Sequence, residues 1–344
     1  MPPNGAGALP PLDRPNVVVA SIQGRGSLPS VRLNELDAVA HVTYLARDET
    51  ITPEEAVTLF RTADFLAVTP KVSPRISPDL IASLPRLRGI ALHATGYDFV
   101  DVDALRDHGI VLSTLPEYST RSVAEQTLGL MLSISSRLHL ANDRSRGLVP
   151  PRTSLRGFEL RGRTLGIVGC GRIGGTVAGL AQAIGMTTLA HDIDPKPVPG
   201  VTYVPRDELL ARSDVLTLHC PLEYEAPPMF GEAQLRALRR GAVLINSSRA
   251  ELVDVAAVVE AVRDGHLRGY AVDDTVFSGA EVADLLAEGR ILQTGHSAWW
   301  TDEVLDRGSW MWADAILAMI AGRPIDVVAG PTVGVGAATP SVRA

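Results

Sequence analysis

A glycine-rich turn between two apolar segments constrains the fold of this chain more than any other feature. Residues 165–168 (Leu-Gly-Ile-Val) form an apolar run, residues 169–174 (Gly-Cys-Gly-Arg-Ile-Gly) follow, and residues 176–183 have helical character. Such a turn needs glycine because the chain reverses tightly, the backbone must approach a pyrophosphate, and the helix must pack closely on its strand. The N–H groups that begin the helix then face the anion. The pattern predicts a dinucleotide site with contacts from Gly169, Gly171, Arg172, Ile173 and Gly174.

Strand-like and helix-like segments alternate on both sides of this turn. In the first part of the chain, apolar runs at 16–22, 64–69, 87–93 and 110–113 alternate with helical stretches at 52–61, 77–84 and 101–108. In the second part, apolar runs occur at 165–168, 187–190, 215–218, 242–245, 269–272 and 291–293. Alternation of this kind predicts parallel, layered α/β sheets, and six strands suit a nucleotide-binding sheet.

A chain of 344 residues is longer than a domain with a single hydrophobic core usually is, so two lobes are expected. The first lobe is predicted to run to about residue 115. Ser122-Val-Ala-Glu125 has the pattern of a capping box and predicts a long helix over 126–142 that joins the lobes.

Composition excludes several classes of protein. A net charge of −7 disfavours a nucleic-acid partner, and no apolar run is long enough to span a membrane. Cys170 and Cys220 form no Cys-x-x-Cys pair, which favours a reducing compartment, and the N-terminal residues lack the features of a secretory signal. A cytoplasmic protein is the expectation. No cluster of His, Cys and Asp has metal-ligand spacing, so no metal is predicted.

An acidic residue follows the glycine turn at the distance expected for ribose recognition. Asp192 lies eighteen residues after Gly174, at the end of the predicted strand, where its carboxylate can accept hydrogen bonds from the adenosine ribose. This position favours NAD, because a carboxylate repels the additional phosphate of NADP. Asp194 is the alternative for this role, and the nearby His191 and Lys196 leave NADP open.

Six ordered motifs between about residues 60 and 320 resemble the D-isomer-specific 2-hydroxyacid dehydrogenase family, which also contains formate and phosphite dehydrogenases and the C-terminal-binding-protein corepressors. They are 94–101 (Ala-Thr-Gly-Tyr-Asp-Phe-Val-Asp), 118–125 (Tyr-Ser-Thr-Arg-Ser-Val-Ala-Glu), the glycine turn, 219–222 (His-Cys-Pro-Leu), 244–254 (Leu-Ile-Asn-Ser-Ser-Arg-Ala-Glu-Leu-Val-Asp) and 294–299 (Thr-Gly-His-Ser-Ala-Trp).

The resemblance implies a particular topology: a Rossmann-type, doubly wound parallel sheet inserted into a second, flavodoxin-like α/β lobe, with the active site in the cleft between them. The expected boundaries are a disordered lead at 1–15, a substrate domain at 16–118 and 300–329, an NAD-binding domain at 119–299, and a flexible tail at 330–344. A homodimer is implied as well.

The resemblance also implies roles for two residues that follow predicted strands. Arg249 would bind the substrate carboxylate through two parallel N–H donors. His296 would act as general acid/base, exchanging a proton with the substrate oxygen as hydride is transferred. At neighbouring positions the chain departs from the family, with Ala250 in place of a usual Gly and Gly295 in place of a common Pro.

Further contacts follow from the same resemblance. The substrate would meet backbone N–H groups around Thr95, Gly96 and Tyr97. Lys71 and Arg121 could bind a second anionic group, although such residues are usually only solvated. Trp299 and Trp300 could wall a substrate pocket or belong to the core. Additional cofactor contacts are expected at Val123, His219, Cys220, Pro221, Ser247, Ser248 and Asp273, the last with the nicotinamide carboxamide.

The main departure concerns the glutamate that normally hydrogen-bonds the catalytic histidine in this family. Counting from Asp273 places Ser278 at that position, and the nearest carboxylates are Asp274 and Glu281. Without a neighbouring carboxylate, the imidazolium form of His296 loses a stabilising opposite charge. Oxidation would then be favoured, reduction would be slow, or the chemistry would be lost.

Three functions therefore remain in view. The first is an NAD(H)-dependent oxidoreductase that acts on a small 2-hydroxy or 2-oxo acid. The second is an NADH-binding regulatory protein of corepressor type, suggested by the absent glutamate and the tryptophan pair. The third is a dehydrogenase of another small anion, such as formate or phosphite.

Overall fold

The computed structural model describes residues 12–330, which form two compact α/β units. Unit 1 comprises the chain up to Tyr118 and again from Leu305, and unit 2 comprises Ser119–Val304. Both units are built on sheets that are parallel or almost entirely parallel, which confirms the predicted α/β class. Most of the expected lead at 1–15, namely residues 1–11, and the tail from residue 331 lie outside the described residues.

The sheet of unit 1 has the strand order β13-β5-β4-β3-β1-β2. Its strands are β1 (Asn16–Ser21), β2 (His41–Ala46), β3 (Phe65–Val68), β4 (Gly89–Leu92), β5 (Val111–Ser113) and β13 (Val327–Ala329). All neighbouring strands pair in parallel except β13, which is antiparallel to β5. The loops after β3 and β4 therefore leave the sheet at the same edge.

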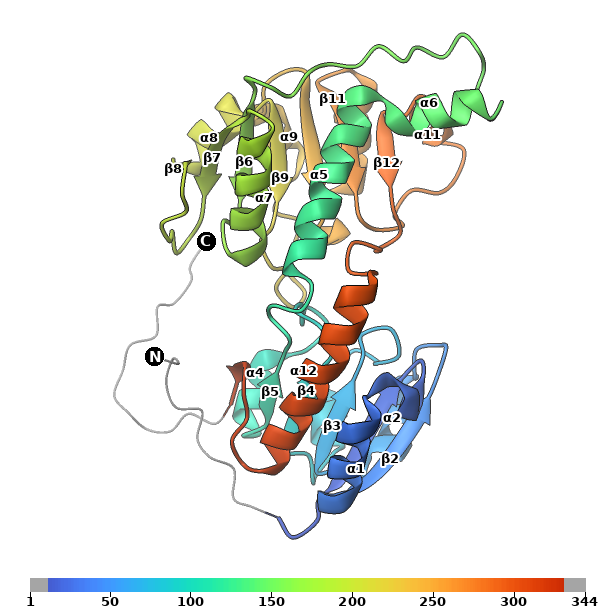
Figure 1. Cartoon of the computed structure of the whole chain (residues 1–344), viewed down its shortest axis with the longest axis vertical. Helices are drawn as coiled ribbons and strands as arrows, with labels where there is room; N and C mark the ends of the chain where they lie inside the picture. The colour runs from blue at the N-terminus through green and yellow to red at the C-terminus, as the bar shows by residue number, and fades with distance from the viewer. Residues whose placement is uncertain (1–11, 331–344) are drawn as a thin grey trace. The chain divides into compact units, whose positions relative to one another are not determined.

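The helices of unit 1 are η1 (Gly24–Ser27), α1 (Ser30–Val39), α2 (Pro53–Phe60), α3 (Pro78–Ala82), α4 (Val102–Asp107) and most of the long α12 (Asp302–Ile320). Three of them begin after a side chain that accepts a hydrogen bond from a free backbone N–H group: Thr52 before α2, Ser77 before α3 and Asp101 before α4. Thr52 and Glu55 form a complete capping box on α2. Helix α12 crosses one face of the sheet (Figure 1), where the buried Trp312 donates a hydrogen bond from its indole nitrogen to the Ala91 carbonyl at 2.9 Å.

The sheet of unit 2 is entirely parallel, with the strand order β12-β11-β10-β9-β6-β7-β8. Its strands are β6 (Thr164–Val168), β7 (Thr187–His191), β8 (Val201–Tyr203), β9 (Val215–Leu218), β10 (Ala242–Asn246), β11 (Leu267–Val272) and β12 (Ile291–Gln293). The order reverses between β6 and β9, and ligands of open α/β sheets bind at the carboxyl ends of the strands at such a switch point.

Helices cover both faces of this sheet. They are α5 (Thr120–Ser136), α6 (Leu138–Ser145), α7 (Arg172–Ala183), α8 (Arg206–Arg212), α9 (Glu232–Ala237), η2 (Ala250–Leu252), α10 (Val255–Arg263) and α11 (Ala283–Ala287). Helices α5 and α7 lie side by side on one face (Figure 1). Buried side chains of β6 and α7, including Ile167, Val177 and Ala181, belong to the core beneath them.

The structure corrects the prediction of the long helix at both of its ends. The helix expected over 126–142 begins at Thr120, so Ser122 lies inside it and its hydroxyl donates to the Ala298 carbonyl instead of capping. Glu125 pairs with Arg121 rather than closing a capping box. The same helix ends at Ser136, and the left-handed backbone of Arg137 (φ 58°) separates α5 from α6. Helix α1 and strands β2, β8 and β13 were not predicted.

Candidate active site

The turn after β6, which we call the glycine loop (residues 169–174), contains three glycines. Each glycine is required for a different geometric reason. Gly169 has a φ of +83°, and a Cβ there would lie 2.6 Å from the His219 carbonyl oxygen. A Cβ on Gly174 would lie 2.2 Å from the Gly169 carbonyl oxygen, because α7 packs directly on the loop. A Cβ on Gly171 would meet no protein atom within 4 Å. The loop therefore leaves open space at the start of α7, where a pyrophosphate would fit.

Asp192 stands directly beside this loop. Its carboxylate accepts a hydrogen bond from the Cys170 backbone N–H at 2.7 Å and another from the Asp194 N–H at 2.9 Å. The Asp194 side chain is exposed, and its carboxylate lies 3.5 Å from the Lys196 ammonium group. Of the two candidate carboxylates, Asp192 is thus the one fixed against the glycine loop.

The loop after β9 contributes His219 and Cys220 at the neighbouring strand end. Burial lowers the pKa of His219 to about 3, so its ring is neutral, and its Nε2 lies 3.0 Å from the Thr217 hydroxyl. The Nδ1 atom is buried without a hydrogen-bond partner, which leaves one polar atom for a ligand. Burial raises the pKa of the Cys220 thiol to about 11, and also raises that of Cys170. Both cysteines are therefore thiols at neutral pH and poor nucleophiles.

Arg249 is held by a hydrogen-bonded turn at the end of β10. The Asn246 amide donates to the Arg249 carbonyl at 2.7 Å and accepts from the Ser248 N–H at 3.1 Å. The Ser248 hydroxyl donates to the Leu218 carbonyl at 3.0 Å, and the buried Ser247 hydroxyl lies 2.7 Å from that of Thr127 on α5. The turn presents Arg249 half-buried at the carboxyl end of a central strand.

The segment after β12, which we call the histidine loop (residues 294–299), is anchored by one buried carboxylate. Asp273 accepts hydrogen bonds from the Thr294 hydroxyl at 2.7 Å and from the backbone N–H groups of Ser297 and Ala298, both at 2.9 Å. Between these anchors His296 adopts a left-handed conformation (φ 58°) and exposes its side chain. Asp273 thus orients the loop, a role that the sequence prediction of a carboxamide contact did not include.

Asp274 brings a second carboxylate to the histidine. Its Oδ2 lies 4.0 Å from His296 Nδ1, and its Oδ1 accepts from the Thr275 N–H at 2.8 Å. Interaction with His296 is the main cause that lowers the pKa of the Asp274 carboxyl, and the charge of Arg249 lowers it further. The structure therefore brings Arg249, Asp274 and His296 together at one edge of the sheet.

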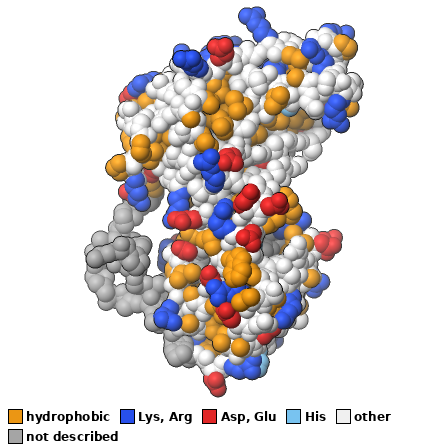
Figure 2. Space-filling view, in the orientation of Figure 1, with side chains coloured by type: hydrophobic (Ala, Val, Ile, Leu, Met, Phe, Trp, Pro, Cys, Tyr) orange, Lys and Arg blue, Asp and Glu red, His pale blue; other side chains and the backbone are white. Residues whose placement is uncertain are grey.

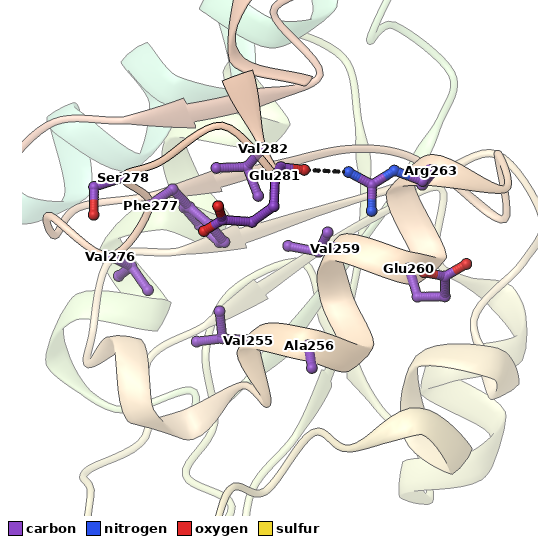
Figure 3. Close-up of a pocket in the computed structure, with 10 residues that line it drawn as sticks. All are labelled: Val255, Ala256, Val259, Glu260, Arg263, Val276, Phe277, Ser278, Glu281 and Val282. Carbon is purple, nitrogen blue, oxygen red and sulfur yellow. Dashed lines mark hydrogen bonds between the residues drawn. The ribbon is translucent and has the colours of Figure 1, made fainter. Parts of the chain in front are cut away.

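Ser278, at the position counted for the family's glutamate, lies in the loop after β11. The Gln293 side chain accepts hydrogen bonds from the Val276 and Phe277 N–H groups and donates to the Phe277 carbonyl, which fixes this loop on β12. Ser278 is exposed and borders a groove of about 460 Å³ between the loop and α10 (Figure 3). The groove is otherwise lined by Val255, Ala256, Val259, Glu260, Arg263, Val276, Phe277, Glu281 and Val282.

The other predicted contacts in unit 2 are distributed over the same sheet edge and its helices. Val123 is buried in α5, Pro221 is exposed after β9, and Arg172 and Ile173 begin α7. Trp299 is partly buried and makes an edge-to-face contact with Trp300, whose side chain is 60% exposed.

In unit 1, the predicted substrate contacts follow two adjacent strands. Lys71 lies exposed after β3, and Thr95, Gly96 and Tyr97 follow β4. The Thr95 hydroxyl donates to the Leu115 carbonyl at 2.8 Å, which fixes the start of this loop.

The surface offers no single charged band on the face in view. Figure 2 shows basic and acidic side chains intermixed with hydrophobic ones. Across residues 12–330, no cluster of three or more His, Cys, Asp or Glu side chains is arranged to hold a metal ion. None of the helices in the described part of the chain has the length and apolar character that a membrane crossing requires.

Comparison with known proteins places this geometry in context. Residues 128–298 match the family model described as the NAD binding domain of D-isomer specific 2-hydroxyacid dehydrogenases. The chain is 32% identical over 304 residues to a glycerate dehydrogenase of Methylorubrum extorquens, covering 83% of this chain and 91% of the relative. It is 32% identical over 282 residues to a glyoxylate reductase of Korarchaeum cryptofilum, covering 78% and 84%. The crystal structure of a D-lactate dehydrogenase from Aquifex aeolicus, complexed with NAD and lactic acid, superposes with a TM-score of 0.77 at 26% identity, covering 92% of this chain and all of that one.

Proposed function

The chain belongs to the D-isomer specific 2-hydroxyacid dehydrogenase family and is an NAD-dependent oxidoreductase, and we propose that it interconverts a small 2-oxo acid and the corresponding 2-hydroxy acid with Arg249 and His296 as its catalytic residues. The observation that carries this proposal is the joint placement of Arg249, Asp274 and His296 at the sheet edge that also bears the glycine loop.

Each side chain has a separate task in this reaction. NADH, when bound, supplies the hydride that adds to the carbonyl carbon of the 2-oxo acid. Arg249 donates parallel N–H hydrogen bonds to the substrate carboxylate and so fixes the orientation of the adjacent carbonyl. His296 delivers a proton to the carbonyl oxygen, which becomes the hydroxyl, and takes it back in the oxidation direction.

Cofactor selection is assigned to Asp192. Its carboxylate is fixed by the Cys170 N–H of the glycine loop and would accept hydrogen bonds from the adenosine ribose, and its negative charge would oppose the additional phosphate of NADP. We assign residues 119–299, all of which lie in unit 2, as the NAD-binding domain. The substrate domain is assigned to residues 16–118 and 300–329, which belong to unit 1 except for residues 300–304. Lys71, Thr95, Gly96, Tyr97 and Trp299 are the proposed substrate contacts, and a cytoplasmic homodimer is the proposed working form.

The test is a panel of 2-oxo acids in an assay that follows NADH absorbance. Glyoxylate, pyruvate, hydroxypyruvate and larger analogues are compared at fixed NADH, with formate and phosphite tested separately in the NAD-reducing direction. We expect turnover with at least one 2-oxo acid, and a preference for NADH over NADPH. Turnover confined to formate or phosphite would reassign the substrate to another small anion.

An Arg249→Lys variant sharpens the test, because lysine keeps the charge but loses the two parallel donors. We expect kcat/KM for the 2-oxo acid to fall by about 10- to 100-fold, or roughly 1.4 to 2.8 kcal/mol, with NADH affinity unchanged. Unchanged turnover in this variant would contradict the role of Arg249.

A regulatory function is the second candidate, favoured by the exposed Trp300 and by the serine at position 278. If the protein is regulatory, we expect tight NADH binding, measured by fluorescence, and no turnover of any 2-oxo acid in either direction.

A further inference from the structure

We propose that Asp274 is the positioning carboxylate for His296, taking over at a different place in the chain the task that the family assigns to a glutamate at the position of Ser278. This inference rests on the proposed function, since it concerns how the proton of His296 is managed. The resemblance to the family gives Asp274 no role, whereas this proposal gives it one.

The carboxylate of Asp274 is oriented by its own backbone. The Thr275 N–H donates to Oδ1 at 2.8 Å, which leaves Oδ2 directed at His296 Nδ1, 4.0 Å away. The Asp274 side chain is 29% exposed, so the pair is shielded more than a fully exposed surface pair. A small approach of the ring would close this distance to a hydrogen bond.

The histidine loop is tethered so that His296 stays beside Asp274. The Gly295 N–H donates to the Asp274 carbonyl at 3.3 Å, immediately before the histidine. On the other side, Ser297 and Ala298 donate to the Asp273 carboxylate. With Nδ1 facing Asp274, the Nε2 atom is left to exchange a proton with the substrate.

Other charged groups near the pair do not compete for this task. Asp273 already accepts three hydrogen bonds from the histidine loop. Glu281, the other acidic residue near position 278, borders the groove against α10, where its carbonyl accepts from Arg263 (Figure 3). Arg249 acts on Asp274 from β10 and, like His296, lowers the pKa of its carboxyl. Asp274 is therefore ionised at neutral pH, as a partner of an imidazolium must be.

The experiment compares the wild-type protein with Asp274→Asn, which keeps an acceptor for the Thr275 N–H and removes the charge. Asp274→Glu restores the charge, and Glu281→Gln is the matched control that removes a carboxylate outside the pair. Reduction and oxidation rates are measured from pH 5 to 10, and the ring signals of His296 are followed by NMR over the same range, with His296→Asn used to assign them.

We expect Asp274→Asn to move the midpoint of the reduction profile and the NMR midpoint together to lower pH, by about one unit. Reduction at pH 8 should fall by up to about tenfold, whereas oxidation should persist to lower pH, because oxidation requires the neutral ring. Structural damage would lower both directions. Asp274→Glu should recover at least part of the shift, and Glu281→Gln should show none.

Several results would overturn the proposal. Unchanged midpoints in Asp274→Asn would show that the carboxylate does not act on His296. A rise in KM for the 2-oxo acid without a change in midpoint would assign Asp274 to Arg249 instead. Failure of the proposed function gives a different result, namely no turnover in the wild-type protein, and the NMR titration still tests the pair in that case.

Discussion

The glycine loop and the histidine loop lie at the carboxyl ends of strands in one sheet, yet they are built in opposite ways. The glycine loop is shaped by backbone geometry: Gly169 and Gly174 have no room for a side chain, and Gly171 leaves space open. The histidine loop is shaped by side chains, because the Asp273 carboxylate holds it at three points. A site made of backbone depends on local sequence, whereas a site made of side chains depends on residues brought in from other strands.

This difference predicts how each loop responds to substitution. Changes in the glycine loop should alter stability or cofactor binding and leave proton transfer intact. Changes in the histidine loop should alter proton transfer and leave cofactor binding intact.

The largest effect is expected from His296→Asn. Asparagine tolerates the left-handed backbone of this position but cannot exchange a proton, so the variant removes the chemistry without straining the loop. We expect kcat to fall by about 10²- to 10⁴-fold. NADH affinity, measured by fluorescence titration, should remain within about twofold of wild type, a difference of roughly 0.4 kcal/mol. Loss of NADH binding in this variant would contradict the proposal that changes in the histidine loop leave cofactor binding intact.

Gly174→Ala and Gly171→Ala form a matched pair within the glycine loop. At Gly174 the new methyl would meet the Gly169 carbonyl oxygen at 2.2 Å, so we expect a loss of about 3 kcal/mol in the free energy of unfolding. At Gly171 the methyl meets no protein atom, so stability should stay within about 0.5 kcal/mol.

The Gly171→Ala and Gly174→Ala variants should also differ in their affinity for NADH. The methyl of Gly171→Ala would occupy the space proposed for the pyrophosphate, and we expect NADH affinity to fall by at least about tenfold, or 1.4 kcal/mol. Denaturant unfolding and NADH titration of both variants provide the measurements. Normal NADH affinity in a stably folded Gly171→Ala protein would mean that the pyrophosphate binds elsewhere.

A third prediction uses His219, a half-buried histidine whose carbonyl lies against Gly169. Burial lowers its folded-state pKa to about 3, below the 6.5 of an unfolded chain. The unfolded state then binds a proton that the folded state does not, so stability falls as the pH drops below 6.5. Between pH 6.5 and 5 this one residue should lower the free energy of unfolding by about 1.6 kcal/mol.

His219→Gln should flatten that pH dependence, because glutamine does not titrate and can still hydrogen-bond Thr217. Burial also lowers the pKa of His93 in unit 1 to about 4, but His93 is present in both proteins and its contribution cancels in the comparison. Unfolding midpoints at pH 7, 6 and 5 give the two slopes. Parallel slopes would indicate that the His219 ring is solvated and protonates freely in the folded protein.

The fold was largely predictable because its strands carry strong local signals. The apolar runs at 16–22, 215–218 and 291–293 became β1, β9 and β12 with nearly the expected bounds. Strand β2 escaped prediction because its residues, His41–Ala46, alternate between half-buried and exposed at the sheet edge and form no continuous apolar run. The helix break at Arg137 also escaped, since an arginine with a left-handed backbone gives no signal in the sequence.

The candidate site divides in the same way. The glycine loop and Asp192 could be predicted because their spacing along the chain is fixed by one strand–helix–strand unit. The hydrogen bonds from the histidine loop to Asp273 and the approach of Asp274 to His296 could not be predicted. They depend on how the loop after β11 packs against the loop after β12. Gln293 holds the loop after β11 against β12, because its side chain accepts hydrogen bonds from the backbone of Val276 and Phe277. Nothing in the sequence around Gln293 indicates this role.

The smallest effect is expected from Ser278→Glu, which returns a carboxylate to the position that the family uses. The side chain of Ser278 is exposed beside the groove against α10, while Asp274 already faces His296. We therefore expect the pH profile of reduction to shift by less than about 0.3 units, or 0.4 kcal/mol, and stability to change by less than about 0.5 kcal/mol. The same substitution in the Asp274→Asn background should fail to restore reduction at pH 8. Restoration there would mean that the loop after β11 can bring position 278 to the histidine, and the histidine loop would then accept its partner carboxylate from either place.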